Sequence, residues 1–213
     1  MIIDDPVYGR QEITDSLAIE IVHTPEMQRL KSINQYGVWD FFDKRYFTSR
    51  FEHSLGVYIL LRRLGASREE QIAGLIHDIS HTAFSHVIDY VFDDLVLQSV
   101  HEKFHEKVIH NSSIPLILKK YGLDVNFILE ESNFKILEKD LPDLCADRVD
   151  YFLRDSLVVG VSSKDQVLNI VNSLQVHGNE IMINDEEVAK LLATNFMKMC
   201  DVFWGPPVQA GSY

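Results

Sequence analysis

The chain has 213 residues, 46% of them hydrophobic, which is enough apolar material to bury the core of one large domain. Lys and Arg number 20 against 32 Asp and Glu, so the formal net charge is -12. This negative charge argues against nucleic acid and anionic membranes as partners, and it requires a local basic pocket for any anionic substrate. The two cysteines lack the spacing of a thiolate metal site, and we find neither a secretory leader nor an apolar run of membrane-spanning length, so we expect a cytoplasmic protein.

Helix start and stop signals divide the chain into a series of predicted helices, after a turn and a short extended piece in residues 1–14. Asp15 is a typical N-cap residue, and Thr24 before a proline is a second start signal for a helix that should stop near Gly37. The aromatic-rich block at residues 38–49 lacks a helical stripe, so we expect an irregular or extended connection there.

Two consecutive helices are predicted next. The apolar spacing of "FEHSLGVYILLRRLG" predicts a helix from Phe51 to near Gly65, and Ser67 with Glu70 forms a capping box that opens the following helix. Further helices are expected at about 84–93, 100–110, 113–121, 124–131, 140–159, 163–174 and 186–204.

The strongest strand signal lies near the C-terminal end, where Gly178 and Asn179 separate two short runs in "LQVHGNEIMI". Many helices against one such signal predict an all-α, bundle-like fold with one small β-hairpin near the C-terminal end.

The densest group of candidate metal ligands lies in "AGLIHDISHTAFSH" at residues 73–86. His77 and Asp78 are adjacent there, His53 lies on the preceding predicted helix, and Asp147 lies on a later one. Imidazoles and carboxylates from several rigid helices suit one divalent cation such as Mn, Fe, Co, Ni or Zn, whereas Mg is expected only together with the substrate. Such an ion lowers the pKa of bound water toward roughly 7 and polarises a phosphoryl oxygen, as phosphoester hydrolysis requires.

A polar stripe continues from Asp147 along its predicted helix. Asp147, Tyr151 and Asp155 are spaced i, i+4 and i+8 and therefore share one face, with Arg154 beside that face and Arg148 at its edge. Burying such a stripe requires a partner that offsets its desolvation, such as a metal and a bound sugar phosphate. The alternative interpretation is a solvated helix face with ordinary ion pairs.

Other polar residues accompany the candidate cation ligands. His81 and His101 could donate a proton to a leaving oxygen or hold a phosphoryl oxygen, because an imidazole pKa of about 6.5 suits proton transfer near neutrality. Arg50 lies three residues before His53 and is a candidate phosphate fork. Residues that we expect to orient these groups are His86, Asp89 and Glu102.

The strings "RFEHSLG", "AGLIHDISHTAFSH", "VHE" and "CADRVDYFLRDS", in this order, resemble the HD-domain metal-dependent phosphohydrolases, and among them the deoxynucleoside triphosphate triphosphohydrolase branch. The resemblance covers about residues 20–160. It implies a single HD-type helical bundle over residues 1–213, with its catalytic core at about 20–160 and a hairpin and C-terminal helix at about 175–204.

The resemblance also implies roles for individual residues. The metal ligands would be His53, His77, Asp78 and Asp147, with Asp78 also counted as catalytic. The phosphates would be contacted by Arg50, His81, His101 and Arg148, the sugar by Tyr151 and Asp155, and the nucleotide by Gln35.

The chain departs from this family in two places. It has Ser80 and Thr82-Ala83 where family members usually have Gly and Gly-Pro, so we expect a narrower pocket beside the HD pair. The triphosphohydrolases are also much longer, and their nucleotide-facing C-terminal parts have no counterpart after Trp204, which does not favour a triphosphate-specific pocket.

The leading hypothesis is a phosphohydrolase that acts on a nucleotide or a similar small phosphate ester. In it the cation activates water, arginines neutralise the phosphoryl charge, and His101 or His81 assists the leaving group. Two alternatives are a non-catalytic nucleotide or metabolite sensor and an HD-type phosphodiesterase, which usually requires a second metal. Assembly into a homo-oligomer is left open by the sequence.

Overall fold

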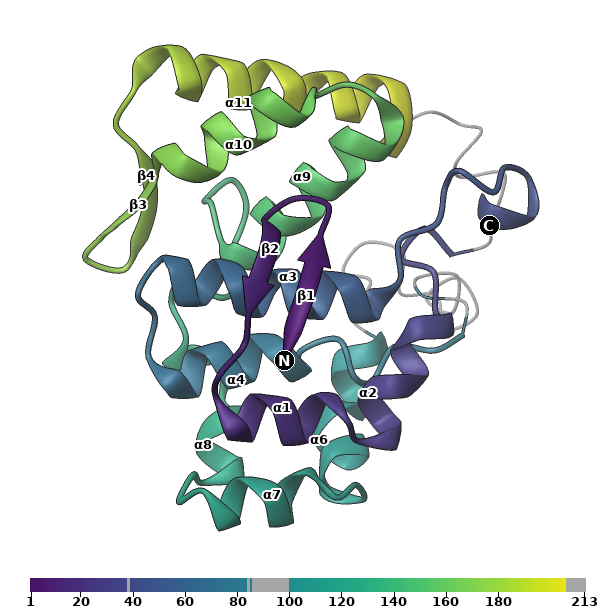
Figure 1. Cartoon of the computed structure of the whole chain (residues 1–213), viewed down its shortest axis with the longest axis vertical. Coiled ribbons are helices and arrows are strands. Elements are labelled where there is room, and N and C mark those ends of the chain that lie inside the picture. Colours follow the sequence, from purple (N-terminus) through teal and green to yellow (C-terminus); the bar gives the residue numbers. More distant parts are fainter. Residues whose placement is uncertain (38, 84, 86–99, 206–213) are drawn as a thin grey trace.

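The structure is a computed structural model that describes residues 1–37, 39–83, 85 and 100–205, and for residues 100–103 it describes the backbone alone. Helices dominate the fold, so the predicted all-α class is confirmed (Figure 1). Two small antiparallel hairpins accompany the helices in the part of the chain that the structure describes, one more than the sequence indicated. Among the described residues, no helix combines the length and the apolar character that crossing a membrane requires.

The additional hairpin lies at the N-terminal end, where β1 (Ile2–Asp5) pairs with β2 (Gly9–Glu12). β2 is mostly polar, β1 has two isoleucines followed by two aspartates, and neither strand shows the alternation that marks a strand in sequence. The Asp5 side chain closes the turn, because its Oδ1 accepts hydrogen bonds from the backbone N–H groups of Val7 and Tyr8 at 2.8 and 2.9 Å. The expected short extended piece is therefore half of a complete hairpin.

The first two helices start where their caps predicted. α1 (Ser16–Val22) is capped by Asp15, and α2 (Pro25–Arg29) is capped by a threonine. The second helix was expected to reach Gly37, but it ends in a short 3-10 turn at residues 30–32. The cause is Asn34, whose side-chain oxygen accepts hydrogen bonds from the backbone at residues 36 and 48 and so competes with helical geometry.

The next two helices start close to their predicted positions, but the second of them lacks the predicted capping box. α3 (Arg50–Arg63) begins with a capping box between Ser49 and the glutamate at position 52. α4 (Arg68–Ile76) is capped by Ser67, whose hydroxyl accepts the N–H of Glu70 at 3.1 Å. The Glu70 carboxylate does not complete a capping box. It turns inward instead and accepts the backbone N–H groups of residues 136 and 137 at 2.7 and 3.0 Å.

The later elements follow the predicted order with one shifted boundary. The helix expected at 140–159 starts only at Ala146, because Pro142 lacks an amide hydrogen and disfavours helical geometry in the residue before it. The helix expected at 84–93 lies outside the described residues except for Ser85. The described elements after α4 are α6 (Val100–His110), α7 (Ile114–Lys120), α8 (Val125–Leu129), α9 (Ala146–Val159), α10 (Lys164–Ser173), β3 (Leu174–His177), β4 (Glu180–Ile183), α11 (Glu186–Met199) and a π-helix (Cys200–Trp204).

Helix α3 lies in the middle of the molecule (Figure 1). It packs against α4 on one side and against α9 on the other, and its residues 57–61 are all buried, as expected for a helix surrounded by others. Helices α10 and α11 pack together beyond α9, and α8 packs on α4. This central position brings residues of α3 next to the end of α4 and the start of α9.

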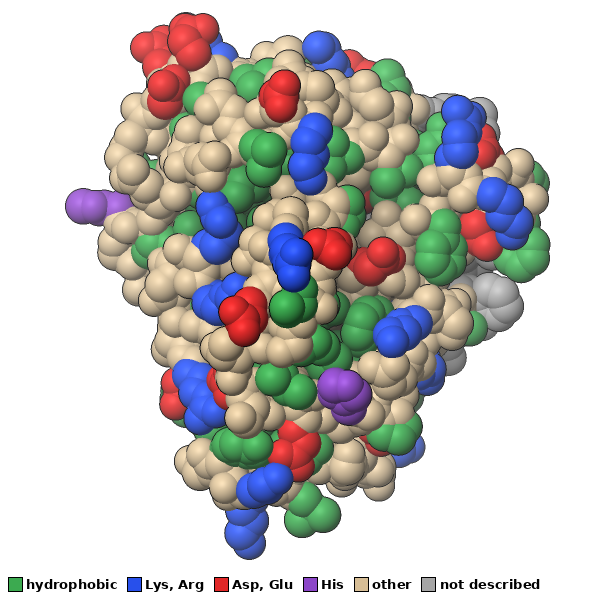
Figure 2. Space-filling view, in the orientation of Figure 1, with side chains coloured by type: hydrophobic (Ala, Val, Ile, Leu, Met, Phe, Trp, Pro, Cys, Tyr) green, Lys and Arg blue, Asp and Glu red, His purple; other side chains and the backbone are tan. Residues whose placement is uncertain are grey.

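Basic and acidic side chains are interspersed on the face shown in Figure 2. Binding to a nucleic-acid backbone depends on a continuous basic surface that neutralises several phosphates. This face does not offer one.

Candidate metal centre

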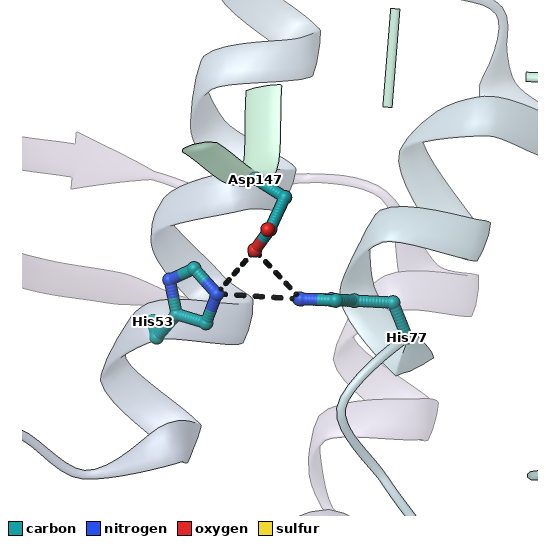
Figure 3. Close-up of side chains that lie close together, drawn as sticks. All are labelled: His53, His77 and Asp147. Atoms are coloured by element: carbon teal, nitrogen blue, oxygen red, sulfur yellow. Dashed lines mark hydrogen bonds and ion pairs between the residues drawn. The ribbon is translucent and has the colours of Figure 1, made fainter. Parts of the chain in front are cut away.

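Three side chains from three helices meet at one point (Figure 3). They are His53 on α3, His77 at the C-cap of α4 and Asp147 in the first turn of α9. Asp147 Oδ1 lies 2.7 Å from His53 Nε2 and 3.3 Å from His77 Nε2, and the two ring nitrogens are 3.3 Å apart. The sequence prediction that Asp147 is close to these histidines therefore agrees with the geometry.

The geometry fits a metal ion. Ligand atoms bound to one ion at about 2.1 Å and at right angles lie about 3 Å apart, and the three separations around His53, His77 and Asp147 range from 2.7 to 3.3 Å. Each imidazole also engages its other nitrogen elsewhere: His53 Nδ1 lies 2.8 Å from Asp150 Oδ2, and His77 Nδ1 lies 2.8 Å from Gly74 O. Neutral rings held in this way present both Nε2 lone pairs to the same point as a carboxylate, which is a donor set for a cation.

The same negative surroundings attract protons. Burial by itself would lower the pKa of His53, but its hydrogen bonds with Asp147 and Asp150 outweigh burial and raise the pKa to about 10. Burial by itself would raise the pKa of Asp147, yet the adjacent imidazoles hold it far below its usual range. The carboxylate of Asp147 is therefore ionised at neutral pH and available to a cation.

Asp78, the fourth predicted ligand, lies beside this group. Its Oδ1 is 3.6 Å from His77 Nε2 and its Oδ2 is 4.0 Å from His53 Nε2. Both oxygens have further partners, because Arg50 Nη1 donates to Oδ2 at 2.7 Å and His81 Nε2 lies 3.2 Å from Oδ1. Burial would raise the pKa of Asp78, but the Arg50 guanidinium and the neighbouring imidazoles keep it well below its ordinary value.

The chain that follows Asp78 is held in place by two arginines. Arg50 Nε donates to Ser85 Oγ at 2.9 Å, and that hydroxyl donates to Asn34 O at 2.7 Å. Arg29, which the sequence analysis did not identify, donates from Nη2 to the carbonyls of Ile79 and His81 at 2.8 and 2.9 Å. Helix α4 ends at Ile76, so His81 lies beyond the helix rather than on it.

The predicted substrate residues lie along α9 and in the segment after α2. Arg148 is held at the start of α9 by the carbonyls of Lys139, at 3.0 Å, and of Asp143. Tyr151 is half-buried, with its ring centroid 5.5 Å from that of Trp204.

Asp155 is buried deeper than Tyr151, and Tyr36 Oη and Trp204 Nε1 donate hydrogen bonds to it at 2.9 and 2.8 Å. Burial is the main cause that raises the pKa of Asp155 to about 7. The side-chain oxygen of Gln35 is buried and has no hydrogen-bond partner among the described residues. The Gln35 amide is therefore a polar group that a ligand could satisfy.

The side chains of four predicted residues lie outside what the structure describes. His86 and Asp89 lie outside the described residues. The backbone of His101 and Glu102 belongs to α6, and their side chains lie outside what the structure describes.

Asp150 is the site residue that the sequence analysis missed. It is completely buried on α9, one turn after Asp147, and it contacts His53. Its spacing of four residues from Arg154 is a signal that could have identified it, because this spacing places the two side chains together on a helix.

Comparison with known proteins extends these observations. A family model described as "HD domain" matches residues 50–155. The uncharacterized protein YdhJ of Bacillus subtilis is 37% identical, over 100% of this chain and 65% of its own length. Metal-dependent phosphohydrolase cns2 of Cordyceps militaris is 34% identical, over 100% of this chain and 63% of its own length. The deoxynucleoside triphosphate triphosphohydrolase SAMHD1 of Gallus gallus is 29% identical, over 89% of this chain and 40% of its own length.

A crystal structure of a hypothetical protein from Aquifex aeolicus has the same fold. It matches with a TM-score of 0.75 and 24% sequence identity, and the match covers 99% of this chain and 61% of that one. This chain therefore spans less than two thirds of the length of each of these proteins.

Proposed function

Because the chain belongs to the HD-domain family, we propose that it is a metal-dependent phosphohydrolase acting on a nucleotide or a related small phosphate ester. The observation that carries the proposal is the convergence of His53 Nε2, His77 Nε2 and Asp147 Oδ1, whose mutual distances lie within 4.8 Å. The names of the Cordyceps militaris and Gallus gallus relatives support a phosphohydrolase and a nucleotide substrate, respectively.

The proposed ligands are His53, His77, Asp147 and Asp78. A divalent cation at this place would supply a Lewis acid for a phosphoryl oxygen and would lower the pKa of a water molecule. Asp78 stays ionised for this role because Arg50 neutralises part of its charge in a buried position.

The remaining proposed roles concern the substrate. His81, whose Nε2 lies 3.2 Å from Asp78 Oδ1, would assist the leaving oxygen, as would His101. Arg50 and Arg148 would neutralise the phosphate charge, because a guanidinium binds phosphate oxygens through two parallel hydrogen bonds. Tyr151 and Asp155 would lie near the sugar, and the buried amide of Gln35 would face the nucleotide.

The test combines metal analysis with product analysis. The protein is stripped with a chelator, reloaded separately with Mn, Fe, Co, Ni or Zn, and assayed over a nucleotide panel for phosphate, pyrophosphate and triphosphate release. The variants are His77→Ala and, as a matched control, His177→Ala, whose side chain is exposed on the β3–β4 hairpin.

We expect His77→Ala to lose bound metal and turnover while His177→Ala keeps both. Turnover that persists in metal-free His77→Ala would refute the proposal. Tight nucleotide binding without release of any phosphate product would support the sensor alternative instead.

A further inference from the structure

We propose that Asp150 is a positioning residue that orients His53 toward the metal ion, and that the N-terminal hairpin takes part in this support through Tyr8 and Asp5. The inference rests on the proposed metal centre. It concerns a carboxylate that is not itself a ligand and a hairpin that lies outside the 50–155 family match.

The hydrogen bonds of Asp150 are the first part of the argument. Its side chain is fully buried, and Oδ2 contacts both His53 Nδ1 at 2.8 Å and Arg154 Nε at 2.6 Å. Oδ1 accepts the Tyr8 hydroxyl at 2.8 Å and Arg154 Nη2 at 3.2 Å. Donors from three different elements thus fix the position of this carboxylate.

The fixed carboxylate determines which way the imidazole faces. With a metal ion bound at Nε2, the single proton of the neutral His53 ring is on Nδ1, and the ionised carboxylate of Asp150 accepts it. The lone pair of Nε2 is then directed at the point shared with His77 and Asp147. Outer partners of this kind typically contribute tenfold to hundredfold to metal affinity.

The N-terminal hairpin enters through Arg154. Arg154 is 2% exposed, so its positive charge is buried and needs negative partners. Asp150 alone would balance that charge poorly, because its carboxylate also contacts His53. Asp5 supplies a second carboxylate, with Oδ2 2.8 Å from Arg154 Nη2. Its other oxygen holds the hairpin turn that positions Tyr8, so a single aspartate links the turn to the buried pair.

Gly56 provides the space for this arrangement. It lies on α3 one turn after His53, and a Cβ atom built there would collide with Arg154 Nη2 and Asp150 Oδ1. The glycine of "HSLG" therefore allows α9 to approach α3 closely enough for Asp150 to reach His53.

The test measures metal affinity, with activity as a secondary readout. Apoprotein variants Asp150→Asn and Tyr8→Phe are titrated with Co²⁺ and with Zn²⁺ against a competing chelator. Tyr121→Phe is the matched control, because it also removes a hydroxyl that donates to a carboxylate, that of Glu20 at 3.0 Å, but in the contact between α7 and α1. Circular dichroism in chelator establishes that each variant is folded.

We expect Asp150→Asn to weaken metal binding by about tenfold to hundredfold and Tyr8→Phe by a smaller factor, on the order of threefold. Tyr121→Phe should bind as wild type does. In the Zn²⁺ form, ¹⁵N NMR should find the proton of His53 on Nδ1 in the wild type and a mixture of ring states in Asp150→Asn.

Two results would overturn the inference: wild-type affinity in folded Asp150→Asn, or a Tyr8→Phe affinity equal to that of the control. If Asp150→Asn does not fold, the metal affinity of Tyr8→Phe alone tests the inference. If the wild-type protein binds no metal, both the proposed function and this inference are refuted. If metal binding depends on His77 but not on Asp150, this inference alone is refuted.

Discussion

Substituting Gly56 with alanine sets two opposing effects against each other. Alanine in a helix interior is favoured over glycine by about 0.5 to 1 kcal/mol, because it restricts the unfolded chain. The added methyl group, however, would collide with Arg154 Nη2 and Asp150 Oδ1 inside the contact between α3 and α9. Helix propensity therefore predicts that Gly56→Ala is more stable than the wild type, whereas the packing of α3 against α9 predicts that it is less stable.

The structure indicates that packing decides the outcome. An extra methyl group in a closely packed interior costs about 1 to 3 kcal/mol, and separating a buried ion pair costs about 3 to 5 kcal/mol. Arg154 and Asp150 are both buried and each has several partners, so neither side chain can move away without losing hydrogen bonds. Taking the ion-pair cost of about 3 to 5 kcal/mol as the larger effect and subtracting the helix-propensity gain of about 0.5 to 1 kcal/mol, we expect Gly56→Ala to lower the free energy of unfolding by about 2 to 4.5 kcal/mol.

Urea unfolding followed by circular dichroism, in chelator, measures this loss without a contribution from metal. Gly74→Ala is the matched comparison, because the Cβ there would mainly meet the ends of the Leu61 and Val57 side chains, which can shift. We expect the loss in Gly74→Ala to be the smaller of the two. A Gly56→Ala protein as stable as the wild type would show that the contact between α3 and α9 is looser than described and would refute the reasoning.

Three further predictions concern stability. Burial raises the pKa of Asp155 to about 7 from its ordinary 3.8, so the folded protein holds a proton that the unfolded chain releases, and stability should fall by about 4 kcal/mol as pH rises from 4 to 7. Asp155→Asn should flatten this fall in urea unfolding, and an unchanged slope would contradict it. Glu70→Ala should cost about 2 to 3 kcal/mol, because two buried N–H groups lose their acceptor, whereas Glu69→Ala should cost under about 0.5 kcal/mol by the same measurement. Metal at about 100-fold above its Kd should raise the Tm of the wild type by about 5 °C or more, and a similar rise in His77→Ala would argue against the proposed ligands.

Local signals predicted the helices well. The caps at Asp15, Thr24 and Ser67 are formed as expected, because capping depends on a few residues next to each other in sequence. The N-terminal hairpin was not predicted as a hairpin, since neither strand alternates apolar and polar residues and its turn depends on the Asp5 side chain. This turn lacks the Asn-Gly, Asp-Gly or Gly-Gly pair that predicts a hairpin turn from sequence.

In the candidate site too, residue types could be predicted from the sequence, whereas contacts between residues far apart in the chain could not. His53, His77 and Asp147 could be proposed from their residue types and from the family resemblance, and the structure brings them together. The role of Asp150 depends on His53 and Tyr8, which are 97 and 142 residues away in sequence. Within "CADRVDYFLRD" the i, i+4 spacing of Asp150 and Arg154 predicts that these two side chains pair, but no local pattern predicts that His53 and Tyr8 contact the same carboxylate.

The separation between Tyr8 and Asp150 affects how this protein is made. A ribosome adding about 5 to 20 residues per second needs about 7 to 28 seconds to synthesise the 142 residues between them. Within that interval, the 70 residues from His77 to Asp147 take about 4 to 14 seconds, and during this time the nascent chain has both histidines but neither Asp147 nor Asp150. On the proposed ligand set, an ion that arrives early would therefore meet two imidazoles without their carboxylate partners, and selective binding of metal would have to wait until α9 has been translated.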